Sequence, residues 1–350
     1  MNESIKNARD IITGYKGRKL RIMEVCGTHT HEIFRLGIRK LLPEQVDLIS
    51  GPGCPVCVTA VGFIDEAVWL TLEKGCTVCT FGDLIRVPGT EMSLAGARSE
   101  GGKIKAVYSP LDAVDFAEKE PQEQVVFLAV GFETTTPSAC LAVKTAQKKG
   151  LKNFSILTAN KTMPNAYNAL VGSADAFLYP GHVNAITGNA VCKKLCEDKG
   201  VSGVVAGFTA GELLTAMAVT LTLADKGEPF FRNCYPRVVK DEGNIPAQKL
   251  IAEVMEPCDS EWRGLGLIPM SGMRLREEYA EFDARKKYRM PKITGRPNPA
   301  CRCGDVLQGK CKPSDCKVFG KVCTPQHPIG ACMVSDEGAC SAYYQYSGLV

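Results

Sequence analysis

The sequence predicts an α/β fold in which two domains of parallel β-sheet and covering helices face a cleft, followed by a small, irregular, Cys-rich C-terminal module. Two observations lead to this prediction. Short β-rich runs alternate with helical patterns over the first two thirds of the chain, and seven of the seventeen cysteines lie between residues 301 and 340. Alternating strands and helices are typical of parallel sheets covered by helices.

Eight β-rich runs, each followed by a helix candidate, are the predicted strands: residues 21–25, 46–49, 77–81, 104–108, 125–130, 155–158, 176–179 and 204–208. The clearest helical patterns cover residues 59–74, 137–149 and 209–224. Gly75, Gly150 and Gly227 follow them closely, where a left-handed helix cap belongs.

Changes in composition predict the domain boundaries. A polar connector at residues 119–123 precedes the apolar run 124–131, so we expect a first domain over 1–120 and a second over 121–230, each with four strand–helix units. The alternation stops near residue 228. Residues 231–350 then form a C-terminal region with a helical part and, from about 291 to 350, a Pro-, Gly- and Cys-rich module with too little apolar content to fold without a staple such as a metal cluster.

Charge and hydropathy argue against several classes of protein. The formal charge is +4, from 42 basic and 38 acidic residues spread along 350 positions, so we expect no nucleic-acid partner. No run reaches the ~18 apolar residues of a membrane span, and the N-terminus lacks a signal-like apolar segment. We therefore expect a cytoplasmic protein, in which thiols stay reduced and serve metals, redox chemistry or burial.

The notable polar motifs follow the carboxyl ends of predicted strands, where α/β proteins bind ligands. They are Cys26-Gly-Thr-His29-Thr-His31, Gly51-Pro-Gly-Cys54-Pro-Val-Cys57, Gly131-Phe-Glu133-Thr134-Thr135-Thr, and Pro180-Gly-His182-Val-Asn184. We expect them to line one cleft between the two domains. The threonines before Pro137 also have the composition of a helix N-cap.

Cys54 and Cys57 form a dithiol motif in a Gly-Pro-Gly loop before a predicted helix. A helix N-terminus lowers the pKa of a nearby thiol and favours the thiolate, which acts as a ligand or a nucleophile. Cys76 and Cys79 have the same spacing but lie in an apolar strand, so burial explains them better.

Cys26 is a candidate iron ligand or nucleophile. Two of the four histidines in the chain, His29 and His31, follow it within five residues. Their imidazoles are candidates for metal ligands or for donors that orient or protonate a bound group.

Taken in order, these motifs and the terminal Gly330-Ala-Cys332-Met-Val-Ser-Asp-Glu337-Gly-Ala-Cys340 resemble those of the HypD-type [NiFe]-hydrogenase maturation factors. The resemblance covers essentially the whole chain. Asn184 departs from it, since serine is expected there, and Cys311 is additional to the pattern.

The resemblance implies a scaffold on which the Fe(CN)2CO unit of the hydrogenase is assembled, in complex with the chaperone HypC and with cyanide delivered by HypE. Cys26 would be the main iron ligand, and Cys54 and Cys57 would bind iron or cycle between dithiol and disulfide. A further set of residues would shape the cleft around cyanide and carbonyl: His29, His31, Glu133, Thr134, Thr135 and His182.

The resemblance also implies a [4Fe-4S] cluster in the terminal module. A cubane needs four thiolates. We expect them to be Cys316, Cys323, Cys332 and Cys340, which leaves Cys301 and Cys303 for a redox bridge.

Two other functions remain open at this stage. One is a self-contained Fe–S dithiol/disulfide oxidoreductase, and the other is a zinc-stapled binding module, although the tail lacks the paired CxxC knuckles of zinc ribbons. The chain has no Gly-x-x-x-x-Gly-Lys-Ser/Thr motif, so ATP hydrolysis is not expected.

Overall fold

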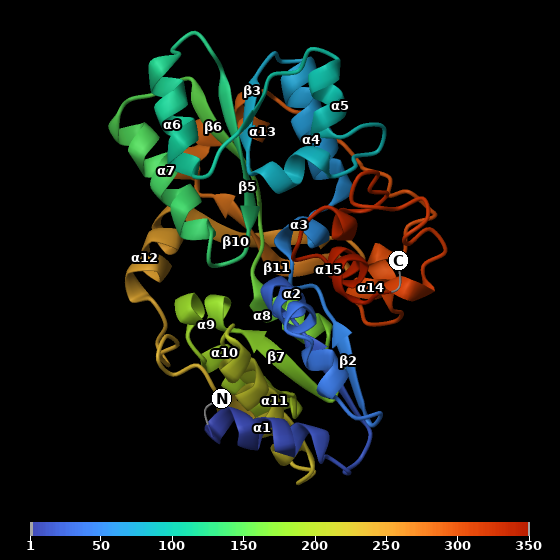
Figure 1. The fold of residues 1–350 in the computed structure, drawn as a ribbon. Helices are drawn as coiled ribbons and strands as arrows, with labels where there is room; N and C mark the ends of the chain where they lie inside the picture. Colours follow the sequence, from blue (N-terminus) through green and yellow to red (C-terminus); the bar gives the residue numbers. More distant parts are fainter. Residues whose placement is uncertain (1–2, 349–350) are drawn as a thin grey trace.

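The computed structural model describes residues 3–348, which contain two parallel β-sheets and one antiparallel hairpin. The first sheet has the strand order β2-β1-β7-β8-β9 and the second β4-β3-β5-β6. In Figure 1 the second sheet lies above the first, the hairpin β10–β11 lies between them, and the red C-terminal segment lies at their side. The α/β class predicted from the sequence is confirmed.

The strands of the first sheet are β1 (Leu20–Glu24), β2 (Val46–Ser50), β7 (Ala176–Pro180), β8 (Ser202–Ala206) and β9 (Phe231–Asn233). Those of the second sheet are β3 (Thr77–Thr80), β4 (Ile104–Ala106), β5 (Val125–Gly131) and β6 (Phe154–Asn160). All eight predicted strands are present. Every residue of β5 is buried, because helices cover both faces of the sheet and apolar residues suit both.

The grouping of strands into sheets differs from the prediction. We expected strands before and after residue 120 to form separate sheets, but β1 pairs with β7 and β3 pairs with β5. Each sheet therefore draws strands from both sides of that position. Alternation along the chain predicts strands and helices, but it does not say which distant strands pair.

The helices up to residue 120 are α1 (Glu3–Thr13), α2 (Gly27–Arg35), α3 (Pro55–Val58), α4 (Val61–Leu72), α5 (Leu94–Ser99) and α6 (Pro110–Lys119). Those that follow, up to the hairpin, are α7 (Thr136–Lys148), α8 (Met163–Ala169), α9 (Gly181–Thr187), α10 (Ala190–Lys199), α11 (Ala210–Ala224) and α12 (Ile245–Val254). Gly75, Gly150 and Gly227 adopt φ values of 64°, 67° and 77°, which confirms the predicted left-handed caps. Within residues 3–348, no helix combines the length and the apolar character that a membrane span requires.

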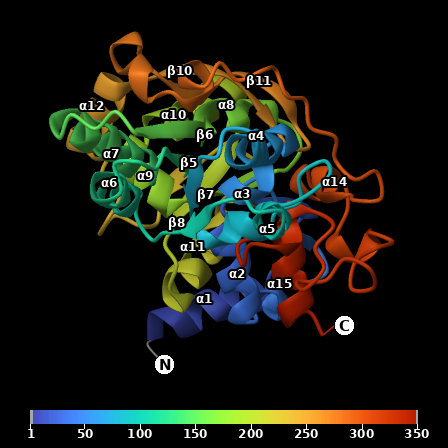
Figure 2. The same cartoon turned by 90° about the horizontal axis from the view of Figure 1, so that it is seen from above.

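The chain after residue 250 connects the two sheets. Strands β10 (Met255–Trp262) and β11 (Gly266–Leu275) pair antiparallel, and Trp262 makes an isolated bridge to Thr59, directly after α3. The short helix α13 (Ala284–Lys287) precedes the Cys-rich tail, which contains α14 (Cys303–Leu307) and α15 (Ala339–Tyr346). Seen from above, α3 lies between the hairpin and α15 (Figure 2).

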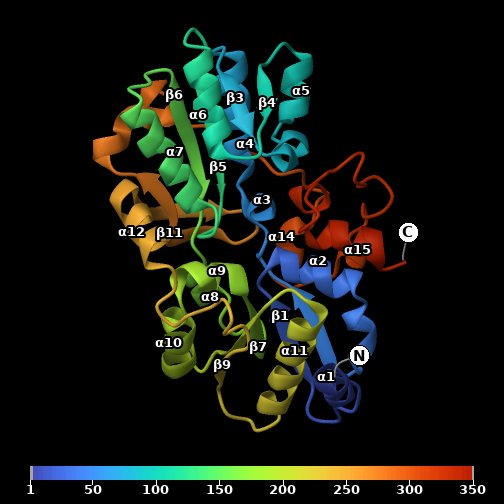
Figure 3. The ribbon, with the colours of Figure 1, turned by 60° about the vertical axis from the view of Figure 1, so that its left-hand side comes forward.

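The tail packs onto the N-terminal half of the chain. Helices α15 and α2 lie side by side (Figure 3), and the rings of Tyr343 and Phe34 are 4.6 Å apart. One buried cluster joins the carboxyl ends of both sheets to the tail; it includes Val25, Cys57, Phe132, Tyr179 and Cys332. The tail is thus part of the core that surrounds the predicted site.

Candidate functional site

The Cys26 and Cys54 motifs touch each other. Their strands, β1 and β2, pair in parallel, so both motifs leave the same edge of the sheet. Gly27 N–H donates to the Gly53 carbonyl at 2.9 Å, and a Cβ on Gly53 would collide with the backbone of Cys26. Glycine is required at position 53 because the two backbones approach so closely.

Cys54 and Cys57 lie on one side of a single helical turn. Cys54 is the N-cap of α3, and its Sγ accepts a hydrogen bond from Cys57 N–H at 3.2 Å. Both side chains are buried. Burial raises the pKa of Cys57 well above its usual range, and the neighbouring thiols of Cys332 and Cys54 raise it further. Without a metal, Cys57 is therefore a protonated thiol.

Cys332 connects this pair to the tail. Its thiol neighbours are Cys303, Cys340 and Cys57, and they lower its pKa. The same network, led by Cys303, raises the pKa of Cys340. Thiols from residues far apart in the sequence therefore converge around Cys332.

The remaining tail thiols lie around this group. Cys303 N–H donates to Cys301 Sγ at 3.4 Å, and Ile329 N–H donates to Cys323 Sγ at 3.3 Å. Cys316 is partly exposed and approaches the Ala300 carbonyl at 4.0 Å. Cys303 is also a thiol neighbour of two of the four expected cluster ligands, Cys332 and Cys340.

The tail has the donor chemistry of a thiolate-ligated cluster. A Cβ on Gly330 would collide with the Sγ atoms of Cys301 and Cys303, so the glycine leaves room beside two thiols. Soft thiolates in this number are what Fe–S clusters require. Among residues 3–348, no three His, Cys, Asp or Glu side chains are arranged as a ready site for one metal ion.

Cys26 is buried beneath the end of the tail. Thr28 Oγ1 donates to Glu337 Oε1 at 2.6 Å, and a Cβ on Gly27 would lie 2.7 Å from Glu337 Cβ. Burial, and next the charge of Glu337, raise the pKa of Cys26 to about 12. A metal ion that binds Cys26 must therefore displace its proton.

The three predicted histidines point in different directions. His29 Nε2 lies 3.1 Å from the Gly207 carbonyl, whereas His31 Nδ1 lies 3.1 Å from that of Asp336. His182 stacks on Phe208 with ring centroids 3.7 Å apart, and the His29 ring centroid lies 4.8 Å from that of Phe208. Burial lowers the pKa of His29 to about 4 and also lowers that of His182. Both are therefore neutral imidazoles at pH 7.

The Glu133 loop contributes one buried carboxyl group. Met163 N–H donates to Glu133 Oε1 at 2.9 Å, while Oε2 is buried without a hydrogen-bond partner among the described residues. Burial raises the pKa of Glu133 to about 7. Thr134 is exposed, and Thr135 is the N-cap of α7, with its Oγ1 donating to the Phe132 carbonyl.

Three polar residues near this loop were not predicted as site residues: Tyr167, Asn184 and Cys192. Asn184 Nδ2 lies 3.4 Å from Cys192 Sγ, and Tyr167 is buried, with Cys192 and Glu133 among the groups that act on its hydroxyl. Helix α8 follows the carboxyl end of β6, but no local signal marks Tyr167 within it. Cys192 lies at helical spacing from Cys196, a pattern that burial alone explains.

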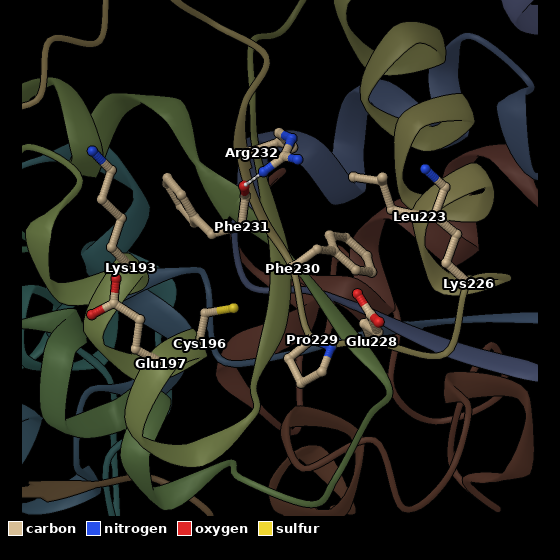
Figure 4. A pocket seen from close by; sticks show the side chains of 10 residues that line it. All are labelled: Lys193, Cys196, Glu197, Leu223, Lys226, Glu228, Pro229, Phe230, Phe231 and Arg232. Atoms are coloured by element: carbon tan, nitrogen blue, oxygen red, sulfur yellow. Dashed lines mark hydrogen bonds between the residues drawn. The ribbon is translucent and has the colours of Figure 1, made fainter.

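A surface pocket of about 450 Å³ lies apart from the predicted site residues. It is lined by segments of α10, α11 and β9, with three basic side chains, two acidic ones and Cys196 (Figure 4). None of its ten lining residues belongs to the predicted site. The candidate site is therefore the buried thiol region and not this pocket.

Comparison with known proteins identifies the family of the chain. A family model described as "HypD: Hydrogenase formation hypA family" matches residues 2–347. The chain is 42% identical over 340 residues to the hydrogenase maturation factor HypD of Azotobacter vinelandii, and 44% identical over 336 residues to that of Escherichia coli (strain K12), covering 94% of this chain and 90% of each relative. It is also 43% identical over 347 residues to a putative hydrogenase expression/formation protein of Methanocaldococcus jannaschii, covering 98% of this chain and 97% of that protein. The chain therefore belongs to the HypD family of hydrogenase maturation factors.

Proposed function

We propose that this maturation factor is the scaffold on which the Fe(CN)2CO unit of [NiFe]-hydrogenase is assembled, with Cys26 as an iron ligand. It acts in the cytoplasm with a HypC-type chaperone and receives cyanide from a HypE-type protein. The contact between Gly53 and the Cys26 backbone carries this proposal, because it brings a candidate iron ligand next to the Cys54/Cys57 dithiol.

Cys54 and Cys57 are proposed either to bind the iron with Cys26 or to cycle between dithiol and disulfide. Forming the disulfide joins the two sulfur atoms and releases two electrons and two protons; reduction reverses both changes. Cys332 is a thiol neighbour of Cys57, so this pair adjoins the tail.

The tail is proposed to hold a [4Fe-4S] cluster on four of its thiolates, taken from Cys301, Cys303, Cys316, Cys323, Cys332 and Cys340. When bound, such a cluster supplies or accepts single electrons. Cys332 has Cys57, Cys303 and Cys340 as thiol neighbours, so the proposed cluster ligands adjoin the dithiol.

Neutral polar groups are proposed to surround the iron ligands. His29, His31, His182 and the Thr134–Thr135 segment would orient cyanide and carbonyl, and Glu133 would donate a proton or a hydrogen bond in its protonated form. Burial keeps Glu133 partly protonated near pH 7 and keeps His29 and His182 uncharged, which limits hydrolysis of the bound groups.

A self-contained Fe–S dithiol oxidoreductase is the second candidate. It is favoured by the chain of thiol contacts from Cys54 to Cys303, which would serve disulfide reduction without any iron at Cys26. The two functions differ in whether cyanide and carbonyl are bound.

The test is anaerobic purification of the complex with the HypC-type chaperone, followed by iron analysis and infrared spectroscopy. The scaffold function predicts cyanide and carbonyl stretching bands that disappear in Cys26→Ala, while the matched control Cys76→Ala retains them. The broad visible absorbance of the cluster should persist in both variants. Absence of these bands from the wild-type complex would leave the oxidoreductase, and wild-type bands in Cys26→Ala would remove the ligand role of Cys26.

A further inference from the structure

Several buried polar atoms have no hydrogen-bond partner among residues 3–348. They include the hydroxyl of Tyr167, Oε2 of Glu133 and Oδ1 of Asn184. An unsatisfied buried polar atom costs on the order of 1–3 kcal/mol. Such atoms persist in native proteins mainly where a ligand, an ion or a water molecule completes them.

Tyr167 is held in this region by its own helix. The side chain is 2% exposed, and its ring lies 5.0 Å from that of Tyr179 in an edge-to-face contact. Helix α8 begins at Met163, whose N–H donates to Glu133 Oε1 at 2.9 Å. Tyr167 lies one helical turn later, on the same side of α8. The helix therefore places the hydroxyl in a fixed relation to the Glu133 carboxyl group.

Tyr167 packs in the same buried cluster as Val25, Cys54 and Cys57. The groups that act electrostatically on its hydroxyl are Cys192 on α10, Glu133 after β5, Tyr179 on β7 and Cys26 after β1. A phenol is protonated at pH 7 and can donate a hydrogen bond. The Tyr167 hydroxyl makes no hydrogen bond to the described residues, and the neighbouring Cys192 Sγ accepts one from Asn184 Nδ2 at 3.4 Å.

A ligand of the iron at Cys26 would be the missing acceptor. Iron-bound cyanide carries negative charge and a lone pair on its nitrogen, and is a strong hydrogen-bond acceptor. Iron-bound carbon monoxide has little charge on its oxygen and accepts only weakly. A rigid, buried donor therefore distinguishes two ligands of nearly the same size.

We propose that Tyr167 is a specificity-determining residue of the site, whose hydroxyl donates a hydrogen bond to the nitrogen of a cyanide bound to the iron at Cys26. This role rests on the scaffold function proposed above. Loss of one hydrogen bond to a charged acceptor in a buried site weakens binding by about 10-fold or more.

The experiment compares Tyr167→Phe with Tyr179→Phe in the complex with the HypC-type chaperone. Both substitutions remove a buried hydroxyl that lacks a partner among the described residues. Tyr179 has Cys192 and Cys196 as electrostatic neighbours, and not Cys26 or Glu133, so it is a matched control. In Tyr167→Phe alone, we expect one cyanide band to shift, the carbonyl band to move less, and bound cyanide to exchange with labelled cyanide about 10-fold faster.

Unchanged cyanide bands and exchange in Tyr167→Phe, or equal changes in both variants, would overturn the role of Tyr167. A wild-type complex without cyanide bands would overturn the scaffold function itself, so the two failures are distinguishable. Unfolding of the free protein gives a second measurement. Because the hydroxyl has no protein partner, Tyr167→Phe should not lower the free energy of unfolding relative to Tyr179→Phe; a larger loss would indicate a structural role instead.

Discussion

Two segments of this chain have identical cysteine spacing and opposite structural environments. Cys54-Pro-Val-Cys57 forms a helical turn at the carboxyl edge of the first sheet, whereas Cys76-Thr-Val-Cys79 runs into strand β3 of the second. In the turn, Cys54 Sγ accepts the N–H of Cys57. In the strand, Cys76 packs on one face of the sheet with Ile64, and Cys79 on the other face with Phe127.

The difference shows that backbone conformation decides whether the two thiols of a CxxC motif lie on the same side. Residues three apart in a strand point to opposite faces, while residues three apart in a helix lie on one side. Burial raises the pKa of Cys57 and of Cys79 alike, so burial does not separate the two motifs. Only in the first motif do the two thiols neighbour each other and a third thiol, that of Cys332.

The largest expected difference between the two motifs is in hydrogenase maturation. Cys57→Ser should reduce maturation to background, because it removes a thiol that contacts both Cys54 and Cys332. Cys79→Ser should retain it, at a cost in stability of about 1–3 kcal/mol for a hydroxyl in an apolar site. The measurement is hydrogenase activity in cells that carry each variant in place of the wild-type chain. Equal loss of activity at equal protein levels would contradict the distinction.

The glycines that precede the two motifs provide the second test. Gly53→Ala should separate Cys26 from Cys54, since the new methyl group collides with the Cys26 backbone. Gly75 has φ 64° but open space around it, so Gly75→Ala should cost only about 1–2 kcal/mol of backbone strain.

Iron content of the anaerobically purified complex and thermal unfolding measure the two effects. Gly53→Ala should lose iron even where it remains folded, and Gly75→Ala should keep it. Full iron content in folded Gly53→Ala would show that the contact between the two motifs is dispensable.

The third test concerns Glu133, which lies just after strand β5. Strand β5 pairs with β3, with Phe127 opposite Cys79. Burial raises the pKa of Glu133 from 4.5 to about 7. Between these pH values the unfolded chain releases a proton that the folded protein keeps, so the free energy of unfolding falls by about 3 kcal/mol as pH rises, and it is level above pH 7.

Glu133→Gln should remove this slope and should weaken maturation more than stability. Denaturant unfolding of both proteins at pH 5 and pH 7 measures it, with Cys79→Ser as the control that keeps the slope. Identical pH profiles for the wild type and Glu133→Gln would show that the carboxyl group is not held in its neutral form.

The strands and the site loops could be predicted because their signals are local. Apolar runs such as 125–130 mark buried strands, and glycines 75 and 150 mark helix ends. The pairing of β1 with β7 could not be predicted, since it depends on side chains about 150 residues apart in sequence. The short β9 and the hairpin β10–β11 lack the regular alternation that identified the other strands.

The sequence predicted which positions form the site, but not where their side chains point. Sequence placed Cys26, Cys54 and Cys57 at strand ends, and they do meet. The sequence did not show that His29 and His31 contact different backbone carbonyls. The two residues are two positions apart on helix α2, so their side chains point in different directions. Tyr167 was missed because nothing local distinguishes a tyrosine that packs in the core from one whose hydroxyl lacks a partner.

The hydrogen bond from Thr28 to Glu337 joins positions 309 residues apart. A ribosome adds about 5–20 residues per second, so Thr28 emerges on the order of tens of seconds before the residue that covers it. Throughout that interval the thiol of Cys26 is uncovered and its enclosure is unfinished. The enclosure of Cys26 can therefore be completed only after the segment that contains Glu337 has been synthesised.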